Sequence, residues 1–332
     1  MPPPFQLVRA EGALHEQILD QTHRLWHDGL TRQRYGQYNE AQMRTAWGAR
    51  HLSRLALVEG DRLLASAKRY DLRVMLDGVP LAAVGIGAVF TPPELRGRGY
   101  GQGIVNALID QARTDGAMLA LLFSEIGPAY YERLGFAPVP LDTCTLVVRQ
   151  AKGAPAVHAR TSDDRDLPTL ADIHASQAAR YRFSLQYDAA WLQFSIARRR
   201  LLCGLGTPGA REIELLVAEE GGRPAAWVLL HVEKSTKGNE AVERWTLESC
   251  GDRDPSGARV GGLLQALLAR TPGHPHPDLR AWWPRGFEPP QVTRRALGPS
   301  SITMMVRALR DDISLEPPLE AASTWYWHAD AF

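Results

Sequence analysis

The first 150 residues alternate between short apolar runs and a few stretches with helical spacing. Apolar residues recur every three or four positions from Leu14 to Leu25, which predicts a helix, and more weakly over Glu40–Ala49. Asp77-Gly78 predicts a tight hairpin turn. The runs with the length and alternation of strands are Phe5–Arg9, Arg54–Glu59, Leu63–Tyr70, Asp71–Leu76, Val79–Thr91, Ala117–Phe123 and Thr143–Arg149. Strands and helices mixed in this order predict an α/β (α+β) fold.

The most apolar of these strands, Val79–Thr91, ends in a glycine-rich turn that opens a helix. The helix runs from about Gly99 to Thr114 and carries one continuous apolar face. Glycines alternate along the turn, at Gly97, Gly99, Gly101 and Gly103. A shorter helix opens at Pro128 and ends near Leu134.

The pattern restarts after Gln150–Pro155, a stretch with Gly and Pro that we interpret as a linker. Three segments of the second half repeat segments of the first in the same order. Arg253–Gly262 precedes a helix as the glycine turn does, Ala281–Phe287 is similar to Ala129–Phe136, and Met304–Arg307 is similar to Leu146–Arg149. These similarities favour an ancient duplication. We expect domains over residues 1–150 and 156–310, followed by a tail over 311–332.

The composition narrows the class of protein. A chain of 332 residues is long enough for two domains that each bury a core. The 38 Lys and Arg residues nearly balance the 37 Asp and Glu residues, which argues against binding nucleic acid through bulk charge. The longest apolar stretch, Leu81–Phe90, is too short to span a membrane, and the N-terminus lacks a signal-peptide pattern. We therefore expect a cytoplasmic protein without a membrane or nucleic-acid partner.

Several polar features have a plain structural interpretation. Three scattered cysteines without a Cys-x-x-Cys pair argue against a disulfide scaffold and a thiolate zinc site. The pair His274 and His276 lies in a His-Pro loop of the kind that is usually solvated, so we expect no metal. Arg198-Arg199-Arg200 is expected to be a solvated helix end, and a contact with RNA or an anionic acceptor is the alternative.

The glycine-rich turn suits a phosphate group. Alternating glycines let consecutive backbone N–H groups point into one space, and the helix start behind them favours an anion. Arg96 and Arg98 add positive charge. The turn is not a Walker motif, since no Gly-Lys-Ser/Thr follows, and it fits the dinucleotide fingerprint poorly. Taken alone, it could equally be a helix-opening loop whose glycines serve packing.

Two motifs together carry a family resemblance. Arg96-Gly-Arg-Gly-Tyr-Gly101 matches R/Q-x-x-G-x-G/A, and about 30 residues on, Tyr130–Phe136 matches aromatic-Tyr-x-x-x-Gly-Phe. In this order and spacing they resemble the GNAT (Gcn5-related N-acetyltransferase) superfamily. Phe123–Tyr131 also resembles the Ser-Glu strand end of the enhanced-intracellular-survival (Eis) branch, which joins two GNAT-like domains to a sterol-carrier-like domain. Only 22 residues follow Arg310, so the third domain is not expected.

The resemblance implies two tandem GNAT-like domains, each a mixed, mostly antiparallel and partly splayed sheet flanked by helices. It implies acetyl transfer from acetyl-CoA to an amine by direct attack in a ternary complex, without a metal. The backbone of Val89, Phe90 and Thr91 would hold the pantetheine arm, with Ser124 at the neighbouring strand end. The turn that would bind the CoA pyrophosphate consists of Arg96, Gly97, Arg98, Gly99, Tyr100, Gly101 and Gln102.

The resemblance also suggests catalytic groups. A phenol keeps its proton at neutral pH and can donate it to the departing thiolate, so Tyr131 is the expected general acid, with Tyr130 as the alternative. Glu125 is one candidate for the general base. In the Eis branch the C-terminal carboxylate is the base. The aromatic tail here ends in Phe332, which we expect to dock into the first domain, although the tail could simply cover an edge.

The second half lacks these parts, because Trp282 and Trp283 stand where the first half has two tyrosines. We expect it to be a scaffold that walls the acceptor pocket. Trp26, His27 and Asp28 lie where GNAT proteins often build that pocket. The acceptor is expected to be a small-molecule or peptide amine. A non-catalytic acyl-CoA-binding regulator and an aminoacyl-tRNA-using tandem GNAT transferase remain as alternatives.

Overall fold

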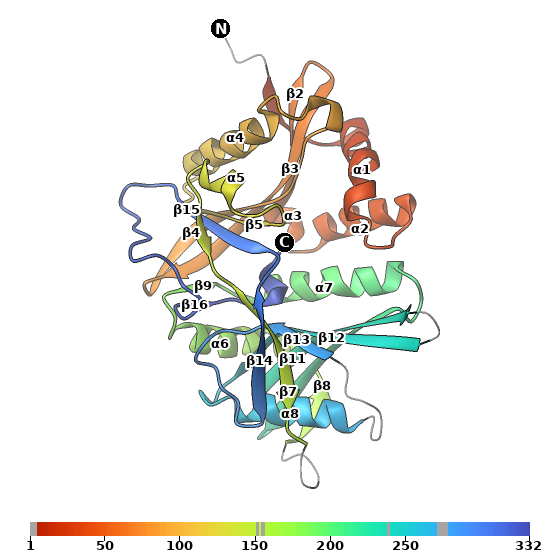
Figure 1. Cartoon of the computed structure of the whole chain (residues 1–332), viewed down its shortest axis with the longest axis vertical. Helices are drawn as coiled ribbons and strands as arrows, with labels where there is room; N and C mark the ends of the chain where they lie inside the picture. The colour runs from red at the N-terminus through yellow and green to blue at the C-terminus, as the bar shows by residue number, and fades with distance from the viewer. Residues whose placement is uncertain (1–4, 151–152, 154–156, 238–239, 271–277) are drawn as a thin grey trace.

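The structure is a computed structural model that describes residues 5–150, 153, 157–237, 240–270 and 278–332 (Figure 1). The α-helices are α1 (Gly12–Trp26), α2 (Arg32–Arg44), α3 (Gly48–His51), α4 (Tyr100–Thr114), α5 (Ala129–Glu132), α6 (Leu167–Ala178), α7 (Ala189–Leu205) and α8 (Ala258–Ala269). Three short 3-10 helices are η1 (Pro93–Leu95), η2 (Asp164–Asp166) and η3 (His328–Asp330). Most of the expected linker, Gln150–Pro155, lies outside the described residues.

The strands form two sheets. They are β1 (Gln6–Arg9), β2 (Leu52–Glu59), β3 (Arg62–Leu76), β4 (Val79–Phe90), β5 (Leu119–Ser124), β6 (Ala137–Val139), β7 (Asp142–Val148), β8 (Ala159–Thr161), β9 (Phe183–Leu185), β10 (Arg211–Glu220), β11 (Arg223–Lys237), β12 (Glu240–Asp252), β13 (Asp278–Trp282), β14 (Val292–Pro299), β15 (Thr303–Ala308) and β16 (Thr324–Trp325). The first sheet has the order β1-β2-β3-β4-β5-β15-β6; off this path, β9 pairs with β3 and β16 pairs with β9. The second has the order β14-β7-β13-β12-β11-β10-β8.

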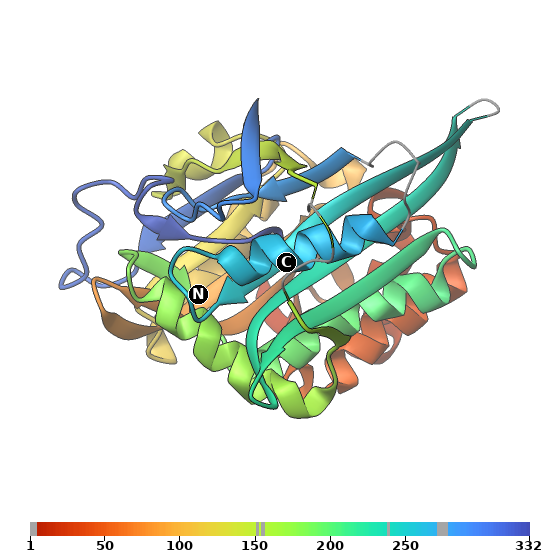
Figure 2. The ribbon, with the colours of Figure 1, turned by 90° about the horizontal axis from the view of Figure 1, so that it is seen from below.

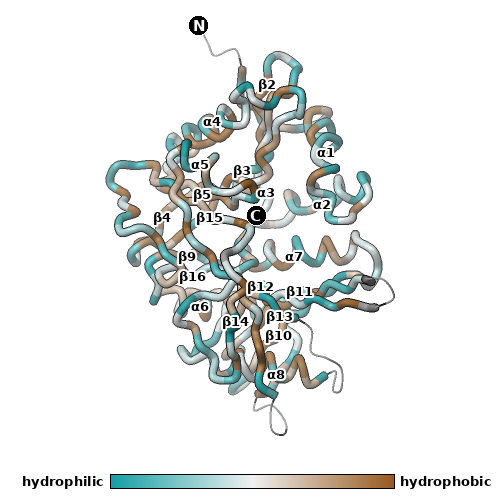
Figure 3. Tube along the Cα trace, in the orientation of Figure 1, coloured by the Kyte–Doolittle hydropathy of each residue, from teal (hydrophilic) through white to brown (hydrophobic). Residues whose placement is uncertain are grey.

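Both sheets are mixed and mostly antiparallel, so the expected fold class is confirmed. Parallel neighbours are β4 with β5, β9 with β16 and β12 with β13. In Figure 3 the strands of both sheets contain many apolar residues, whereas the outer helices alternate between polar and apolar ones. This is the pattern expected when helices cover the faces of a sheet and present one polar side to solvent.

Helices cover both faces of each sheet, and successive residues of a strand pack against helices on opposite faces. In β2, Leu57 belongs to the core under α4, while its neighbours Ala56 and Val58 pack with Ile18 of α1. The second sheet is covered in the same way, by α6 and α7 on one face and by α8 on the other (Figure 2). Since successive strand residues point to opposite faces, near-continuous apolar runs are required in such strands.

Each half of the chain contributes to the sheet of the other half. β7, from the first half, pairs with β13 and β14 in the second sheet. β15, from the second half, lies between β5 and β6 in the first sheet. These strands contain Leu146–Val148 and Met304–Arg307, from the segments whose sequences resemble each other. The linker therefore does not mark the boundary between the two sheets, because each sheet contains strands from both sides of it.

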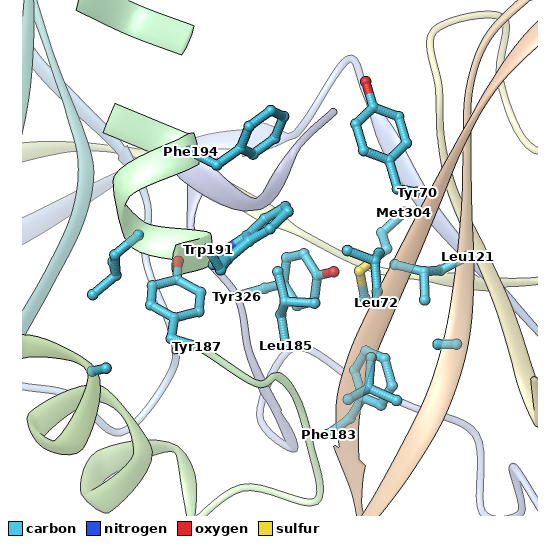
Figure 4. Close-up of a cluster of buried hydrophobic side chains, with 14 of the residues drawn as sticks. Tyr70, Leu72, Leu121, Phe183, Leu185, Tyr187, Trp191, Phe194, Met304 and Tyr326 are labelled. Carbon is cyan, nitrogen blue, oxygen red and sulfur yellow. The ribbon is translucent and has the colours of Figure 1, made fainter. Parts of the chain in front are cut away.

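An apolar core continues from one half to the other (Figure 4). Trp191 of α7 lies 4.8 Å from Trp47, centroid to centroid, and Phe194 lies 4.6 Å from the same indole. Tyr326 from the tail enters the cluster and stacks on Phe183 of β9. This shared core and the exchanged strands fix the two halves against each other.

The weak helix expected over Glu40–Ala49 is wrong in its bounds. Helix α2 begins earlier because Thr31 caps it, its hydroxyl accepting a hydrogen bond from the N–H of Arg34 at 3.3 Å. It ends at Arg44, and α3 is a separate short turn. The buried residues of α2 include tyrosine, asparagine and glutamine, so the apolar spacing that normally reveals a helix is weak here.

The strand exchange predicts that the first half does not fold alone. A fragment of residues 1–150 lacks β15, so β5 and β6 have no strand between them, and β7 has no partners. We expect this fragment to show no cooperative thermal transition by circular dichroism, whereas the full chain unfolds cooperatively. A monomeric fragment with a sharp transition would contradict the structural role assigned to the exchange.

Candidate active site

A pocket of about 470 Å³ lies over the middle strands of the first sheet, beneath α2, α7 and the end of the chain. Four residues predicted from the sequence line it: Val89, Glu125, Tyr131 and Phe332. Trp26 and Asp28, expected near an acceptor, also line it, whereas His27 does not. The pocket therefore brings together groups from distant parts of the chain.

One wall of the pocket is formed where β4 and β5 diverge. The two strands pair only from Ala83 to Ile86 on β4, so Val89 and Phe90 have no partner on β5. Ala88 has a positive φ of 47°, and the register with β3 shifts opposite it. This kink leaves the edge of β4 unpaired beyond Ile86. The two strands thus splay apart, as the family resemblance of the sequence predicts. The Thr91 carbonyl is not free, because it accepts a hydrogen bond from Arg96 at 3.3 Å.

The glycine-rich turn lies at the end of this edge and leads into α4. Gly97 and Gly99 have φ values of 77° and 84°, and a Cβ on either would meet no atom within 4 Å. The N–H groups of Gly97, Arg98 and Gly99 form no hydrogen bond with any described residue. Open space in front of unpaired N–H groups at a helix start fits a phosphate group.

The other turn residues surround these amides. The side chains of Arg96, Arg98 and Gln102 are exposed, while the ring of Tyr100 packs on the core under α4. A Cβ on Gly101 would come within 3.0 Å of the Tyr130 hydroxyl and 3.3 Å of the Thr91 hydroxyl. Gly101 is therefore needed for close packing of the turn against α5.

The two tyrosines of α5 have different surroundings. Their rings are perpendicular, with centroids 4.9 Å apart. Tyr131 is buried and lines the pocket, whereas the Tyr130 hydroxyl lies over Gly101. Burial, with smaller contributions from Tyr130 and Glu125, raises the pKa of Tyr131 to about 12. Tyr131 thus keeps its proton throughout the neutral range.

Ser124 and Glu125 follow β5 and have separate roles in the structure. The buried Ser124 hydroxyl donates a hydrogen bond to the carbonyl of Gly127 at 2.6 Å, which fixes the turn before α5. Ser124 is not part of the pocket lining. Glu125 is exposed at the pocket rim and forms no hydrogen bond or ion pair with any described residue.

Phe332 lies directly on β4. Its ring is 4.5 Å from the ring of Tyr70 and 5.3 Å from that of Phe123, centroid to centroid. A Cβ on Gly85 would lie 2.4 Å from the Phe332 ring, and one on Gly87 would lie 3.2 Å from its carbonyl oxygen. Its carboxylate forms no ion pair or hydrogen bond with the described residues. The end of the chain therefore occupies space that exists because both strand positions are glycine.

The residues before Phe332 anchor the tail between the two halves. Trp327 is fully buried among Trp283, Phe287 and Trp325. Asp330 is fully buried and accepts hydrogen bonds from the Tyr187 hydroxyl and from the N–H of Trp327. Its pKa is raised to about 7 by burial, which outweighs these hydrogen bonds.

A buried ion pair supports the same segment from the second sheet. Arg199 of α7 and His328 of the tail both contact the carboxylate of Glu248, at 2.5 and 3.0 Å. Although burial acts in the opposite direction, Arg199 and His328 hold the pKa of Glu248 below its usual range. Arg198 donates a hydrogen bond to the Ala331 carbonyl at 3.2 Å. The expectation of a solvated arginine run is therefore wrong for Arg198 and Arg199, because α7 lies between the halves.

Three basic residues of the pocket were missed or misplaced from the sequence: Arg54, Lys68 and Arg198. Arg54 and Lys68 lie within β2 and β3, where they interrupt otherwise apolar runs. Such an interruption is the one local signal that could have indicated them. The sequence alone does not show that they face the same pocket.

The corresponding turn of the second half is closed. The carboxylate of the buried Asp252 accepts hydrogen bonds from the N–H groups of Arg259 and Val260 at the start of α8. A Cβ on Gly257 would lie 2.7 Å from the Phe287 ring, and one on Gly261 would lie 2.0 Å from the Gln291 amide oxygen. The side chains of the protein itself thus fill the place that an anion would need.

Two kinds of feature are absent from the described residues. They contain no group of three or more His, Cys, Asp or Glu side chains arranged to hold a metal ion, and His274 and His276 lie outside them. No helix among the described elements has the length and apolar character needed to cross a membrane.

The raised pKa of Asp330 predicts a pH-dependent stability. Because its pKa of about 7 in the folded protein exceeds the usual value near 3.9, folding takes up a proton between these values. Asp330 therefore stabilises the fold fully below about pH 4, and this contribution falls by up to about 4 kcal/mol as the pH rises to about 7. Chemical denaturation of the wild type and of Asp330→Asn across this range should show a difference that changes with pH. Parallel curves would contradict this account.

Comparison with known structures shows the fold. The chain aligns with a GCN5-related N-acetyltransferase from Anabaena variabilis at a TM-score of 0.66 and 11% identity, covering 92% of this chain and 73% of that one. For a GCN5-related N-acetyltransferase from Kribbella flavida, the TM-score is 0.64 at 16% identity, with coverages of 92% and 71%. For Eis1 from Mycobacterium abscessus, it is 0.57 at 13% identity, with coverages of 92% and 73%.

Comparison of sequences identifies a domain in the first half of the chain. Comparison with curated proteins finds no significant match. The family model described as an acetyltransferase (GNAT) domain matches residues 13–139, a range that includes the splayed strands, the glycine-rich turn and Tyr131. The fold and this match agree with the resemblance to tandem GNAT proteins of the Eis type. Residues 13–139 therefore form a GNAT acetyltransferase domain, within a two-sheet structure similar to tandem GNAT structures.

Proposed function

We propose that the protein is an N-acetyltransferase that transfers the acetyl group of acetyl-CoA to an amine in a ternary complex. The observation that carries the proposal is the presence of Tyr131, the free Phe332 carboxylate and the unpaired edge of β4 in one pocket. Membership of the GNAT family supports an acyl-CoA donor. The amine acceptor and the residue roles are part of the proposal.

The donor would bind along β4 and over the glycine-rich turn. The unpaired backbone of Val89 and Phe90 offers hydrogen bonds to the pantetheine amides, as an added strand would receive them. The free N–H groups of Gly97, Arg98 and Gly99, with the exposed Arg96 and Arg98 side chains nearby, would hold the pyrophosphate. In this arrangement the thioester end of the donor would lie at the pocket.

The reaction needs a base and an acid. The Phe332 carboxylate would take a proton from the acceptor ammonium, and the free amine would attack the thioester carbon. The nitrogen–carbon bond forms as the carbon–sulfur bond breaks. Tyr131 would donate its proton to the departing thiolate, and the second proton that the nitrogen loses as the amide forms would return to Tyr131 through water. The Phe332 carboxyl group would then release the first proton to solvent. A carboxylate without an ion pair and a buried phenol suit these two roles. Glu125, exposed at the rim, is the other candidate base.

The function is tested by measuring thiol release from acetyl-CoA with a panel of small amines and peptides. We expect turnover with at least one class of amine, and loss of acetyl-CoA binding in Gly99→Glu, which puts a bulky anion at the turn. Binding of acetyl-CoA without thiol release for any amine would instead support a non-catalytic, acyl-CoA-binding role.

Deleting Phe332 should lower kcat by about 100-fold or more, because the carboxylate moves to Ala331 and away from Gly87. The matched control is Phe332→Leu, which keeps a terminal carboxylate while removing the ring, and which should retain most of the turnover. Steady-state kinetics with the best amine of the panel distinguishes the two variants. Unchanged kcat after the deletion would rule out Phe332 as the base and leave Glu125.

Replacing the phenol in Tyr131→Phe should lower kcat by about 100-fold with little change in KM, because the variant lacks the proton donor. Tyr130→Phe is the control and should be close to wild type. Since the pKa of Tyr131 is about 12, its titration should cause no fall in kcat below about pH 10. Full turnover in both variants would contradict the acid role.

A further inference from the structure

The pocket contains three basic side chains that form no ion pair with a described residue. Arg54, Lys68 and Arg198 all line it, from β2, β3 and α7. None of the three forms an ion pair with a carboxylate among the described residues, although most other buried or half-buried arginines of the protein do. The two acidic side chains of the pocket, Asp28 and Glu125, are exposed at its rim.

The hydrogen bonds of these residues are also incomplete. Arg54 is only 1% exposed, and its Nε and Nη1 atoms have no hydrogen-bond partner, while Nη2 donates to the Asn39 oxygen at 2.9 Å. Lys68 forms no hydrogen bond with any described residue. The Nε atom of Arg198 is buried and has no partner among the described residues, although the rest of its guanidinium group bonds the Ala331 carbonyl and the Tyr38 hydroxyl. Arg54 is buried, and Lys68 and Arg198 are half-buried. Since a buried charge without an ion pair is costly, this group calls for a compensating interaction.

Strand register shows that two of these residues point into the same space as the end of the chain. Arg54 pairs directly with Lys68, and Lys68 pairs directly with Gly87. Directly opposed residues present their side chains on the same face of a sheet, so Arg54, Lys68 and Gly87 form a row across three strands. The Phe332 carbonyl oxygen lies 3.2 Å from where a Gly87 Cβ would be. The row therefore leads from the chain end toward Arg54.

The three positive charges repel one another. Burial, and then the neighbouring Arg54 and Arg198, lower the pKa of Lys68 well below its usual value, and Asp28 at the rim offsets this only in part. The Phe332 carboxylate does not neutralise the group, because it forms no ion pair with any described residue. A bound anion would remove the mutual repulsion, and guanidinium groups match the oxygen geometry of a carboxylate or phosphate.

We propose, as a consequence that rests on the acetyltransferase function above, that the acceptor amine carries an acidic group, a carboxylate or a phosphate. That group binds among Arg54, Lys68 and Arg198, while the amine lies toward Phe332 and Tyr131. Neighbouring strands are about 4.8 Å apart, so the row from Gly87 to Arg54 spans roughly 10 Å. The acidic group and the amine of the acceptor are accordingly several bonds apart. Purely cationic amines, such as polyamines, are poor acceptors.

The test compares ω-aminocarboxylates of increasing chain length with the matching ω-aminocarboxamides, which differ only in charge, and with ω-aminoalkylphosphonates. We expect an acid to exceed its carboxamide in kcat/KM by about tenfold or more at the best length. The better of the carboxylate and phosphonate series identifies the anion. Carboxamides that equal their acids at every length would overturn the proposal.

Variants identify the residues. Lys68→Met removes a charge from a side chain that makes no hydrogen bond, and should abolish the preference for acids. Arg200→Met is the matched control: it removes one charge from an exposed residue of α7 that is outside this pocket, and should keep the preference. A preference that survives Lys68→Met overturns the assignment.

A binding measurement separates this proposal from the proposed function. Calorimetry on the protein saturated with CoA, which has no acetyl group to transfer, compares the same acids and carboxamides. Acid-selective binding that Lys68→Met removes, without thiol release in the acetyl-CoA assay, would support the anion site and count against the acetyltransferase function. Thiol release without any preference for acids would support the function and overturn the anion site.

Discussion

The contact between Phe332 and β4 is the constraint on which the rest of the pocket depends. The ring and the carboxyl group occupy space over Gly85 and Gly87 that a Cβ would fill at 2.4 and 3.2 Å. A side chain at Gly85 would force the Phe332 ring to move, and one at Gly87 would crowd the carboxyl group. The kink at Ala88 follows immediately, so the strand that accepts the tail also diverges from β5.

The anchoring of the tail can be understood from the same constraint. A chain end is normally mobile, because few contacts offset its conformational entropy. Here the preceding residues bury two tryptophans and a carboxyl group that is hydrogen-bonded to Tyr187. They contact both halves of the protein. The second half thus supplies the support for a group that lies in the first, even though its own helix start is closed by Asp252 and Phe287.

The sequence was most informative where the chemistry is local. The glycine-rich turn, the splayed strand and the short helix with Tyr131 lie within about 45 residues of one another, and their spacing identified the family and the segments around the pocket. The basic residues and the exchanged strands depend on long-range pairing instead. Lys68 joins Arg54 and Gly87 through strand register, which local patterns do not determine. β7 and β15 have similar sequences, so the sequence of neither strand shows which sheet it joins.

The position of β15 has a consequence for synthesis of the protein. A chain is made from its N-terminus, and the parts made first can fold first. Here β5 and β6 cannot complete their pairing until residues 303–308 are made, and these emerge from the ribosome more than a hundred residues later. During that interval two apolar strand edges lack their central partner, a situation in which chaperones bind nascent chains. The half of the protein that is translated first is therefore the half that is completed last.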